Sequence, residues 1–422
     1  MALTFEINKL GAIRDSIIKF KPLLIFSGQS NSGKSYAAFL IYYVLKHISE
    51  LELLEFINKK FPDEIKGLKS FNEAKIVIEV DSFNKWLNDN VSSYMKYLLN
   101  SDNINYSGKI YAEFDKIELN FSVYEENANN KKATILVVKN LDKQYYLQSV
   151  ESVPYVVSQI FSENLSEQIL GSNLKNTLFL PPSKSALVNI NSVNTDFVNL
   201  GMYKEFLKDY GIIKELNKST FWQKIPNSLK KNIKSFMENI LGGSISEINN
   251  ELYFSFSNVK IPISAAASSI KELAPFIIAI NKYPPSELSI LFEEPESHLH
   301  PTMQLELAKL IAILHNYQCF FQITTHSDLF ISQINNLIRL NNLKKNNKKL
   351  FNEYIEKFNF SSQHALSTEN IGAYLFKKND KGITKILQQN IENGISLDSM
   401  DSAVENLYNQ TVFLDNVTEK NK

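Results

Sequence analysis

The stretch Phe26–Ser35, which reads FSGQSNSGKS, constrains the fold of this chain more than any other. It contains a glycine, four intervening residues, and then glycine, lysine and serine in unbroken order. In such a loop successive backbone N–H groups point at an anion, the lysine reaches the outer phosphates of a nucleotide, and the serine hydroxyl can ligate magnesium. The residues predicted to hold a nucleotide are Gly28, Gln29, Ser30, Asn31, Ser32, Gly33, Lys34, Ser35 and Tyr36.

The segments on both sides of this loop agree with that interpretation. A phosphate loop needs a strand before it and a helix after it. Residues 22–26 form a short apolar run typical of a buried strand, and residues 36–45 are apolar and lack glycine and proline, as a buried helix should. The alternative is a tight strand-to-helix turn in which Lys34 is solvated.

A second segment supplies the acidic partner that a phosphate loop requires. The apolar run 288–292 delivers Glu293 and Glu294 at its C-terminal end, where an open α/β sheet presents its ligands. We predict that Glu293 binds magnesium, directly or through water, and that Glu294 polarises the attacking water. Alternatively, the two acids only precede a helix that begins near Pro301, where acidic residues are ordinarily favourable.

A further strand, predicted over residues 319–324, ends in Thr325, His326 and Ser327. His326 is predicted to hydrogen-bond the terminal phosphate and to respond to its loss. A histidine that only caps a helix or packs in the core is the alternative.

The rest of the chain predicts an interrupted α/β architecture. The first 50 residues read as strand, turn, strand, phosphate loop and helix, and residues 177–180 resume the strand pattern before the proline-rich segment 181–187. We therefore predict a head built from residues 1–50 and 177–422, with a helical subdomain at about 195–241. Residues 51–176 mix helices with alternating strands, including 117–124 and 133–138 on either side of a polar tip, and are predicted to form an α+β insertion.

Composition excludes some classes of protein. Lysine plus arginine equals aspartate plus glutamate at 45 each, so no global field directs the chain to nucleic acid. The single cysteine, Cys319, lies in an apolar run and cannot form a disulfide within the chain. No apolar run is long enough to span a bilayer, and the N-terminus lacks the pattern of a signal peptide. We therefore expect a cytoplasmic protein without a membrane partner.

Three motifs in order resemble one protein class. The phosphate loop, then Glu-Glu-Pro-Glu-x-His-Leu-His-Pro and then Thr-Thr-His-Ser resemble the ABC-type ATPases of the overcoming-lysogenization-defect (OLD) class and related prokaryotic defence ATPases. The long separation of Lys34 from Glu294 suits an ABC-type head that carries insertions. The resemblance extends to the segments 180–185, 241–243 and 372–376. It implies a RecA-like mixed sheet flanked by helices, ATP and Mg²⁺ as cofactors, hydrolysis of ATP to ADP and phosphate, and a homodimer or higher oligomer that closes around ATP.

The resemblance also assigns roles to single residues. It makes Glu293 the magnesium-coordinating acid, Glu294 the catalytic glutamate, His300 a loop residue that faces the dimer partner, and His326 the switch histidine.

In ABC-type heads a serine-bearing helix start caps the γ-phosphate held by the other subunit, and residues 264–273 are the candidate here. Ser269 and Glu272 have capping-box spacing, which predicts a helix start with free N–H groups, and Ser268 and Ser269 are the predicted contacts. The alternative is that Ser269 and Glu272 only cap their own helix. Ile270 stands where relatives have glycine, which could slow hydrolysis. Lys184 likewise stands where relatives often have arginine.

The segment after His326 reads as a helix, a polar linker, a hairpin that turns at 379–382, and a final helix from about Leu397. It shows no acidic cluster of the kind a fused nuclease needs. The leading hypothesis is an ATP-driven switch that controls a separate effector encoded nearby, in anti-phage defence. The alternative is a DNA-binding clamp of the recombination or repair kind, in which the lysine-rich run 344–349 contacts phosphates, unless that run is a solvated linker. A third possibility is a nucleotide-binding scaffold that scarcely turns over.

Overall fold

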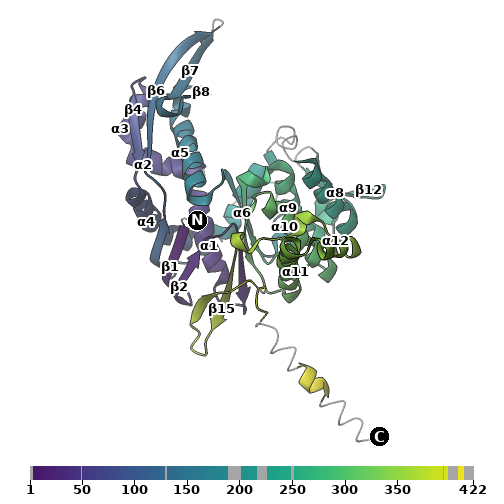
Figure 1. Ribbon diagram of the computed structural model, residues 1–422. Coiled ribbons are helices and arrows are strands. Elements are labelled where there is room, and N and C mark those ends of the chain that lie inside the picture. The colour runs from purple at the N-terminus through teal and green to yellow at the C-terminus, as the bar shows by residue number, and fades with distance from the viewer. Residues whose placement is uncertain are drawn as a thin grey trace, which may run out of the picture.

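A nine-stranded sheet forms the centre of the protein (Figure 1). The computed structural model describes residues 3–48, 50–128, 131–188, 201–215, 226–248, 251–392, 394–397 and 407–412. The strands lie in the order β5 (Ser107–Ala112), β1 (Leu3–Leu10), β2 (Ile13–Lys19), β16 (Thr384–Gln388), β15 (Ile371–Lys378), β3 (Leu23–Gly28), β14 (Phe320–Thr324), β13 (Leu288–Glu293) and β9 (Asn176–Leu180).

The five strands from β15 to β9 are parallel, and this half of the sheet positions the site. Strands β3, β13 and β14 are buried along their whole length, as the continuous apolar runs in the sequence predict for parallel strands covered on both faces. Because the strands are parallel, the residues that follow β3, β13 and β14 meet at one edge of the sheet.

The other half of the sheet is mostly antiparallel. Strands β1 and β2 form a hairpin, β5 pairs with β1, and β15 and β16 form a second hairpin. The turn of this second hairpin was predicted at 379–382, and there the Asn379 side chain accepts hydrogen bonds from the backbone N–H groups of Lys381 and Ile383. A mixed sheet flanked by helices confirms the predicted α/β fold class.

Helices cover the parallel strands. The helix α1 (Lys34–Ile48) packs against β3, β14, β13 and β9, and it is followed by α2 (Glu50–Lys60) and α3 (Pro62–Lys69). Later helices are α9 (Ser268–Lys282), α10 (Pro301–Asn316), α11 (Asp328–Asn346) and α12 (Lys348–Lys357). Within the part of the chain that the structure describes, no helix combines the length and apolar character needed to cross a membrane.

The range 51–176 contributes to two sheets. Strands β4 (Ala74–Ile78), β6 (Ile117–Ala128), β7 (Lys131–Val138) and β8 (Lys143–Leu147) form a separate four-stranded sheet that extends away from the large sheet in Figure 1. Helix α3 packs against β4 and β6, and Phe161 of α5 (Val153–Leu170) contacts Phe121 of β6. Helix α4 (Val80–Leu99) instead packs against β5, α1 and α6. Strand β5, from the same range, instead pairs with β1 at the edge of the large sheet. The chain therefore returns to the large sheet and its helices at α4 and β5 before it continues into β6.

The segment before α9 is helical and then β-structured. Helices α6 (Gly201–Glu215) and α8 (Asn227–Ile240) fall in the range predicted to be helical, whose residues 195–200 and 216–225 lie outside the described part. Strands β10 (Ser244–Ile248), β11 (Glu251–Phe256) and β12 (Val259–Pro262) then form a small antiparallel sheet that leads into α9.

The C-terminal region differs from the sequence prediction at one point. The run 344–349, predicted as a polar linker, lies at the end of α11 and the start of α12. The break between these helices is only Asn347, whose side chain accepts a hydrogen bond from the N–H of Leu350. Local polarity predicted a loop, but Asn347 caps α12 and the buried Phe351 anchors it. Of the predicted final helix, residues 407–412 are helical and residues 398–406 lie outside the described part.

Candidate nucleotide site

The glycine-rich loop joins β3 to α1, as the sequence predicts. Strand β3 ends at Gly28 and α1 begins at Lys34. Within the loop, the Ser32 hydroxyl donates to the carbonyl of Gln29 at 2.7 Å. Gly28 and Gly33 have φ angles of 127° and 93°, which L side chains rarely adopt. A Cβ atom at Gly28 would lie 2.5 Å from the carbonyl oxygen of Phe376, so only glycine fits there.

The first hairpin supports the loop from the side. A Cβ atom at Gly33 would approach the Ile13 side chain to 3.0 Å, and one at Gly11 would approach the Tyr36 ring to 2.6 Å. The loop and the start of α1 therefore pack directly on the turn between β1 and β2. The half-buried ring of Tyr36 is positioned by this packing.

Lys34 is the buried cation of the site. Its ammonium group donates to the carbonyls of Gly28 and Gln29 at 3.0 Å each and lies 2.9 Å from His326 Nε2. Burial lowers the pKa of Lys34 to about 8, and the nearby carboxylates, Glu294 foremost, oppose that change. Because an ammonium only donates, the Nε2 atom of His326 must accept this hydrogen bond and be unprotonated.

His326 lies directly after β14, in the loop that leads to α11. Its ring lies between the glycine-rich loop and the Glu294 carboxylate, whose Oε1 atom is 3.7 Å from Nε2. Burial, and then the charge of Lys34, lower the pKa of His326 below its ordinary value. The site therefore favours the neutral imidazole at physiological pH.

Glu293 and Ser35 face each other across the site. The carboxylate of Glu293, at the end of β13, accepts a hydrogen bond from the Ser35 hydroxyl at the start of α1. Glu293 is fully buried, and this burial raises its pKa to about 7. Lys34 is close enough to Glu293 for each charge to act on the other. The predicted neighbourhood of the glycine-rich loop and the twin acids is therefore present.

Glu294 has a strained backbone and a more exposed side chain. Its φ angle is 44°, in the left-handed region that a residue with a side chain adopts at a cost of about 1–3 kcal/mol. Its N–H donates to the carbonyl of Thr324 at 2.9 Å, and its side chain, which is 39% exposed, accepts from the Ser297 hydroxyl at 3.1 Å. The turn thus directs the second acid toward solvent while Glu293 stays buried.

Glu296 organises the site, although sequence reasoning gave it no role. A single oxygen, Oε1, accepts hydrogen bonds from the Thr325 hydroxyl at 2.8 Å, the His326 N–H at 2.7 Å and the Ser327 N–H at 3.1 Å. It therefore ties the loop after β13 to the loop after β14 and fixes the backbone of His326. The only hint of this role in the sequence was that Glu296 is the third acid of the Glu-Glu-Pro-Glu motif.

The predicted capping box at the start of α9 is wrong. The helix does begin at Ser268, but the residue before it, Ala267, makes no side-chain cap, and Glu272 turns inward. The Glu272 carboxylate lies 3.1 Å from Lys184 Nζ and accepts from the Ser185 N–H at 3.1 Å. Glu272 pairs with the buried Lys184 and does not cap its own helix, because leaving a buried charge without a partner is very costly.

The Lys184–Glu272 pair connects α9 to the segment that follows β9, at the same edge of the sheet as Glu293. Both side chains are almost fully buried, and the Lys184 ammonium also lies 4.9 Å from the centre of the Phe292 ring, next to Glu293. The remaining residues predicted to face a second subunit are accessible. Ser268 is exposed, Ser269 is half-buried, and the exposed His300 accepts the N–H of Thr302 at the start of α10.

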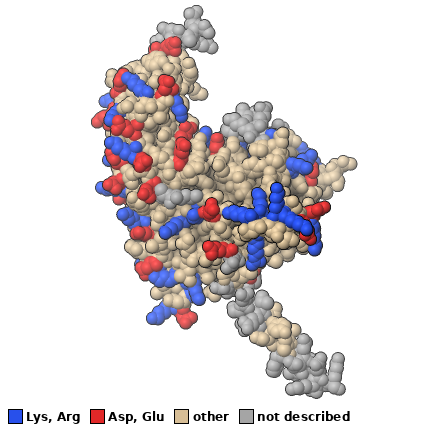
Figure 2. Space-filling model, in the orientation of Figure 1, with Lys and Arg blue, Asp and Glu red and all other residues tan. Residues whose placement is uncertain are grey.

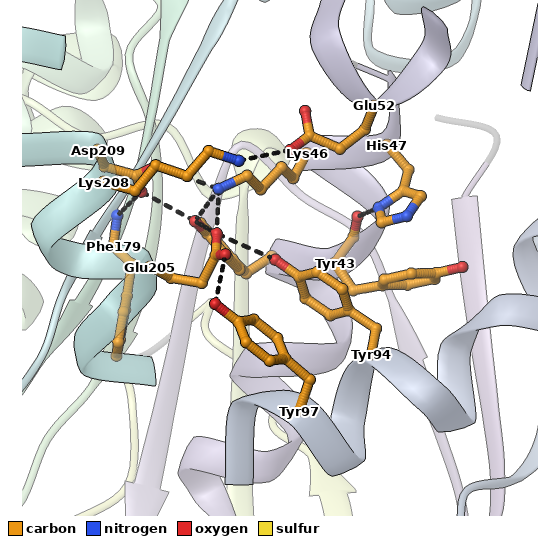
Figure 3. Close-up of polar contacts among 11 residues, drawn as sticks. Tyr43, Lys46, His47, Glu52, Tyr94, Tyr97, Phe179, Glu205, Lys208 and Asp209 are labelled. Carbon is orange, nitrogen blue, oxygen red and sulfur yellow. Dashed lines mark hydrogen bonds and ion pairs between the residues drawn. The ribbon is translucent and has the colours of Figure 1, made fainter. Parts of the chain in front are cut away.

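A buried ion cluster anchors the other end of α1 (Figure 3). Lys46 of α1 pairs with Glu205 and, at 3.1 Å, with Asp209, both on α6. Asp209 also accepts from the N–H of Phe179 in β9, and Glu205 accepts from the Tyr97 hydroxyl of α4. The cluster therefore fixes the helix of the glycine-rich loop to α4, α6 and β9, and local sequence patterns did not reveal it.

Replacing Lys46 with alanine should destabilise the protein by about 3–5 kcal/mol, because two carboxylates would stay buried without their cation. Urea unfolding monitored by circular dichroism measures this change. Lys60→Ala removes an exposed lysine from α2 and serves as the control. A loss below about 1 kcal/mol for Lys46→Ala would show that the cluster contributes little.

Comparisons with known proteins bear on this site. The sequence model of the family described as "AAA ATPase domain" matches residues 1–331. Comparison with curated proteins finds no match.

Similar solved structures include an Smc head bound to the C-terminal winged-helix domain of ScpA, with 12% identity, 96% of this chain and 98% of that chain covered, and a TM-score of 0.39. They also include the SMC head domain from Thermotoga maritima, with 11% identity, coverage of 93% and 100%, and a TM-score of 0.35. An Smc head with an extended coiled coil, bound to the C-terminal domain of ScpA derived from Pyrococcus furiosus, has 13% identity, coverage of 96% and 98%, and a TM-score of 0.37.

Proposed function

Because this chain belongs to the AAA ATPase domain family, we propose that it is an ATP-driven switch: two copies close around ATP, and hydrolysis reopens them. The chain is an ATPase by its family. The observation that carries the proposal is the gathering of one lysine, two acids and one histidine at a single edge of the sheet. These are Lys34, at the start of the helix after β3, Glu293 and Glu294 at the end of β13, and His326 just after β14.

We assign phosphate binding to the backbone of residues 28–33 and to Lys34. The helix α1 presents its N-terminus to the loop, which adds a partial positive charge where phosphate would lie. The Lys34 ammonium has three N–H donors. Two of them bind loop carbonyls and the third binds His326. A phosphate that attracts the ammonium would therefore also change the contact of Lys34 with His326.

Ser35 and Glu293 fit Mg²⁺, which prefers hydroxyl and carboxylate oxygens. The Glu293 carboxylate is buried and its pKa is raised to about 7, so a nearby divalent cation would favour its ionised form. When bound there, Mg²⁺ would offset the negative charge of the phosphates.

We assign the general base to Glu294. Its carboxylate is partly exposed at the edge of the buried site, so it can accept a proton from a water molecule that attacks the terminal phosphate. The water oxygen forms the new bond to phosphorus, the bond to the ADP oxygen breaks, and the proton passes to Glu294. The Ser297 hydroxyl and the left-handed backbone turn hold this carboxylate in position.

Closure by a second copy would complete the site. Ser268, Ser269 and His300 are accessible in the single chain, which is compatible with contacts to a nucleotide held by another subunit. The Lys184–Glu272 pair supports this assignment, because it fixes the helix that carries the serines relative to Phe292 and Glu293.

Light scattering tests the switch. The Glu294→Gln protein should remain a monomer without nucleotide and become a dimer with Mg²⁺ and ATP, because bound ATP is no longer consumed. Adding Ser269→Glu should prevent the dimer through repulsion of the γ-phosphate, whereas Ser93→Glu, at an exposed position on α4, should not. A mass that ATP does not change, although ATP is bound, would contradict the switch.

We further propose that the switch controls a separate effector in anti-phage defence, which rests on the resemblance of the three motifs to OLD-class and defence ATPases. The test is protection of cells against phage by the chain together with its neighbouring gene. Protection should be lost with Glu294→Gln, and protection that is independent of Glu294 would reject the proposal.

A further inference from the structure

The junction of α11 and α12 concentrates positive charge. Lys344 and Lys345 lie in the last turn of α11, and Lys348 and Lys349 lie in the first turn of α12. All four side chains are exposed. Figure 2 shows lysine and arginine side chains gathered over the part of the surface that α11 and α12 form in Figure 1. We call Lys344, Lys345, Lys348 and Lys349 the lysine cluster.

The lysine cluster lies in a segment with few acidic residues. No aspartate or glutamate occurs in the sequence between Asp328 and Glu353. None of the four lysines forms an ion pair with any residue that the structure describes. The whole chain has equal numbers of acidic and basic residues, so this local excess does not follow from the overall composition.

The stability of α12 does not explain the cluster either. The N-terminus of a helix carries a partial positive charge and favours acidic residues, so Lys348 and Lys349 lie where lysine is unfavourable. Asn347 already caps this helix with its side chain. Lys344 and Lys345, in the last turn of α11, do complement that helix end, so the charge that helix stability leaves unexplained is that of Lys348 and Lys349.

We propose that the lysine cluster binds the phosphate backbone of nucleic acid. Mobile lysine side chains suit a repeating line of phosphates, and the exposed Asn346 between the two lysine pairs can donate to phosphate or sugar oxygens. The ring of Phe358, at the end of α12, is 51% exposed and offers a surface for an unpaired base. This surface lies outside the nucleotide site, so the inference is independent of the proposed switch.

Fluorescence anisotropy with short labelled duplex and single-stranded DNA tests the inference on the full chain. The wild-type protein should bind at low salt, and its affinity should fall steeply as salt increases. The quadruple variant Lys344→Gln, Lys345→Gln, Lys348→Gln and Lys349→Gln should bind at least about tenfold more weakly. The slope of log affinity against log salt should fall in magnitude by about 3.6 for duplex DNA, or about 0.9 for each of the four lysines.

A matched variant controls for net charge. Lys59, Lys60, Lys377 and Lys381 are exposed lysines on other elements, and their replacement by glutamine removes the same charge. This variant should keep wild-type affinity. Equal weakening in both variants, or no binding of either DNA by the wild type, would overturn the proposal. So would binding of anionic lipid vesicles by the lysine cluster in the absence of DNA binding.

Discussion

Replacing Glu294 with glutamine should reduce steady-state ATP hydrolysis at least about 100-fold and leave ATP affinity within a few-fold of wild type. The glutamine keeps the size and the Ser297 contact of the side chain but cannot accept the proton of the attacking water. Phosphate release under saturating Mg²⁺ and ATP measures the first effect, and equilibrium binding of a fluorescent ATP analogue measures the second.

Glu353→Gln is a suitable control for that experiment, because it removes an exposed acid from α12, outside the site. It should hydrolyse ATP at the wild-type rate. Unchanged hydrolysis in Glu294→Gln would exclude Glu294 as the base. If the variant lost ATP binding as strongly as it lost hydrolysis, the substitution would have damaged the site.

Replacing Lys34 with alanine should weaken ATP binding by at least about 100-fold, or roughly 2.7 kcal/mol. The ammonium is the only lysine held at the glycine-rich loop by described contacts, and a charged hydrogen bond to phosphate contributes about 1.5–3 kcal/mol. Calorimetric titration with ATP and Mg²⁺ measures the change.

Lys9→Ala removes an exposed lysine from β1 and controls for the lost charge. It should bind ATP as tightly as the wild type. The Lys34→Ala protein should still fold, because burial lowers the pKa of Lys34 and so disfavours its charged form in the folded protein. Tight ATP binding by this variant would show that the phosphates bind elsewhere.

The parts of the site that the sequence predicted depend on contiguous residues and on strand ends. The loop from Gly28 to Ser35 carries its own strand and helix signals on either side. Glu293 and His326 each follow a buried apolar run, and the ends of parallel strands share one edge of a sheet. Their meeting could therefore be expected without knowing the strand order.

The parts that the sequence missed depend on pairs distant along the chain. Glu272 reads locally as a helix cap, but its partner is Lys184, and only the fold brings the two together. The pairing of Lys46 with Glu205 and Asp209 has the same origin. Strand β5 reads as part of the insertion, although its hydrogen-bond partner is β1. The sequence shows that a buried charge needs a counter-charge and that a strand edge needs a hydrogen-bonded neighbour. It does not show which distant residue or strand is the partner.

Glu296 is an intermediate case. The sequence places it two residues after the predicted acid pair Glu293 and Glu294, yet its three hydrogen bonds are to the loop after another strand. Its role is to hold that loop, and this could be recognised only when the two strands were seen as neighbours.

A crystal structure of the Glu294→Gln protein grown with Mg²⁺ and ATP tests the central claim most directly. We predict triphosphate density against residues 28–34, with Mg²⁺ between the Ser35 hydroxyl and the Glu293 carboxylate. Lys34 should then contact phosphate in place of the Gly28 and Gln29 carbonyls that it contacts here. Nucleotide bound at another place, or bound with Glu293 still paired to Ser35 and no metal between them, would contradict the account.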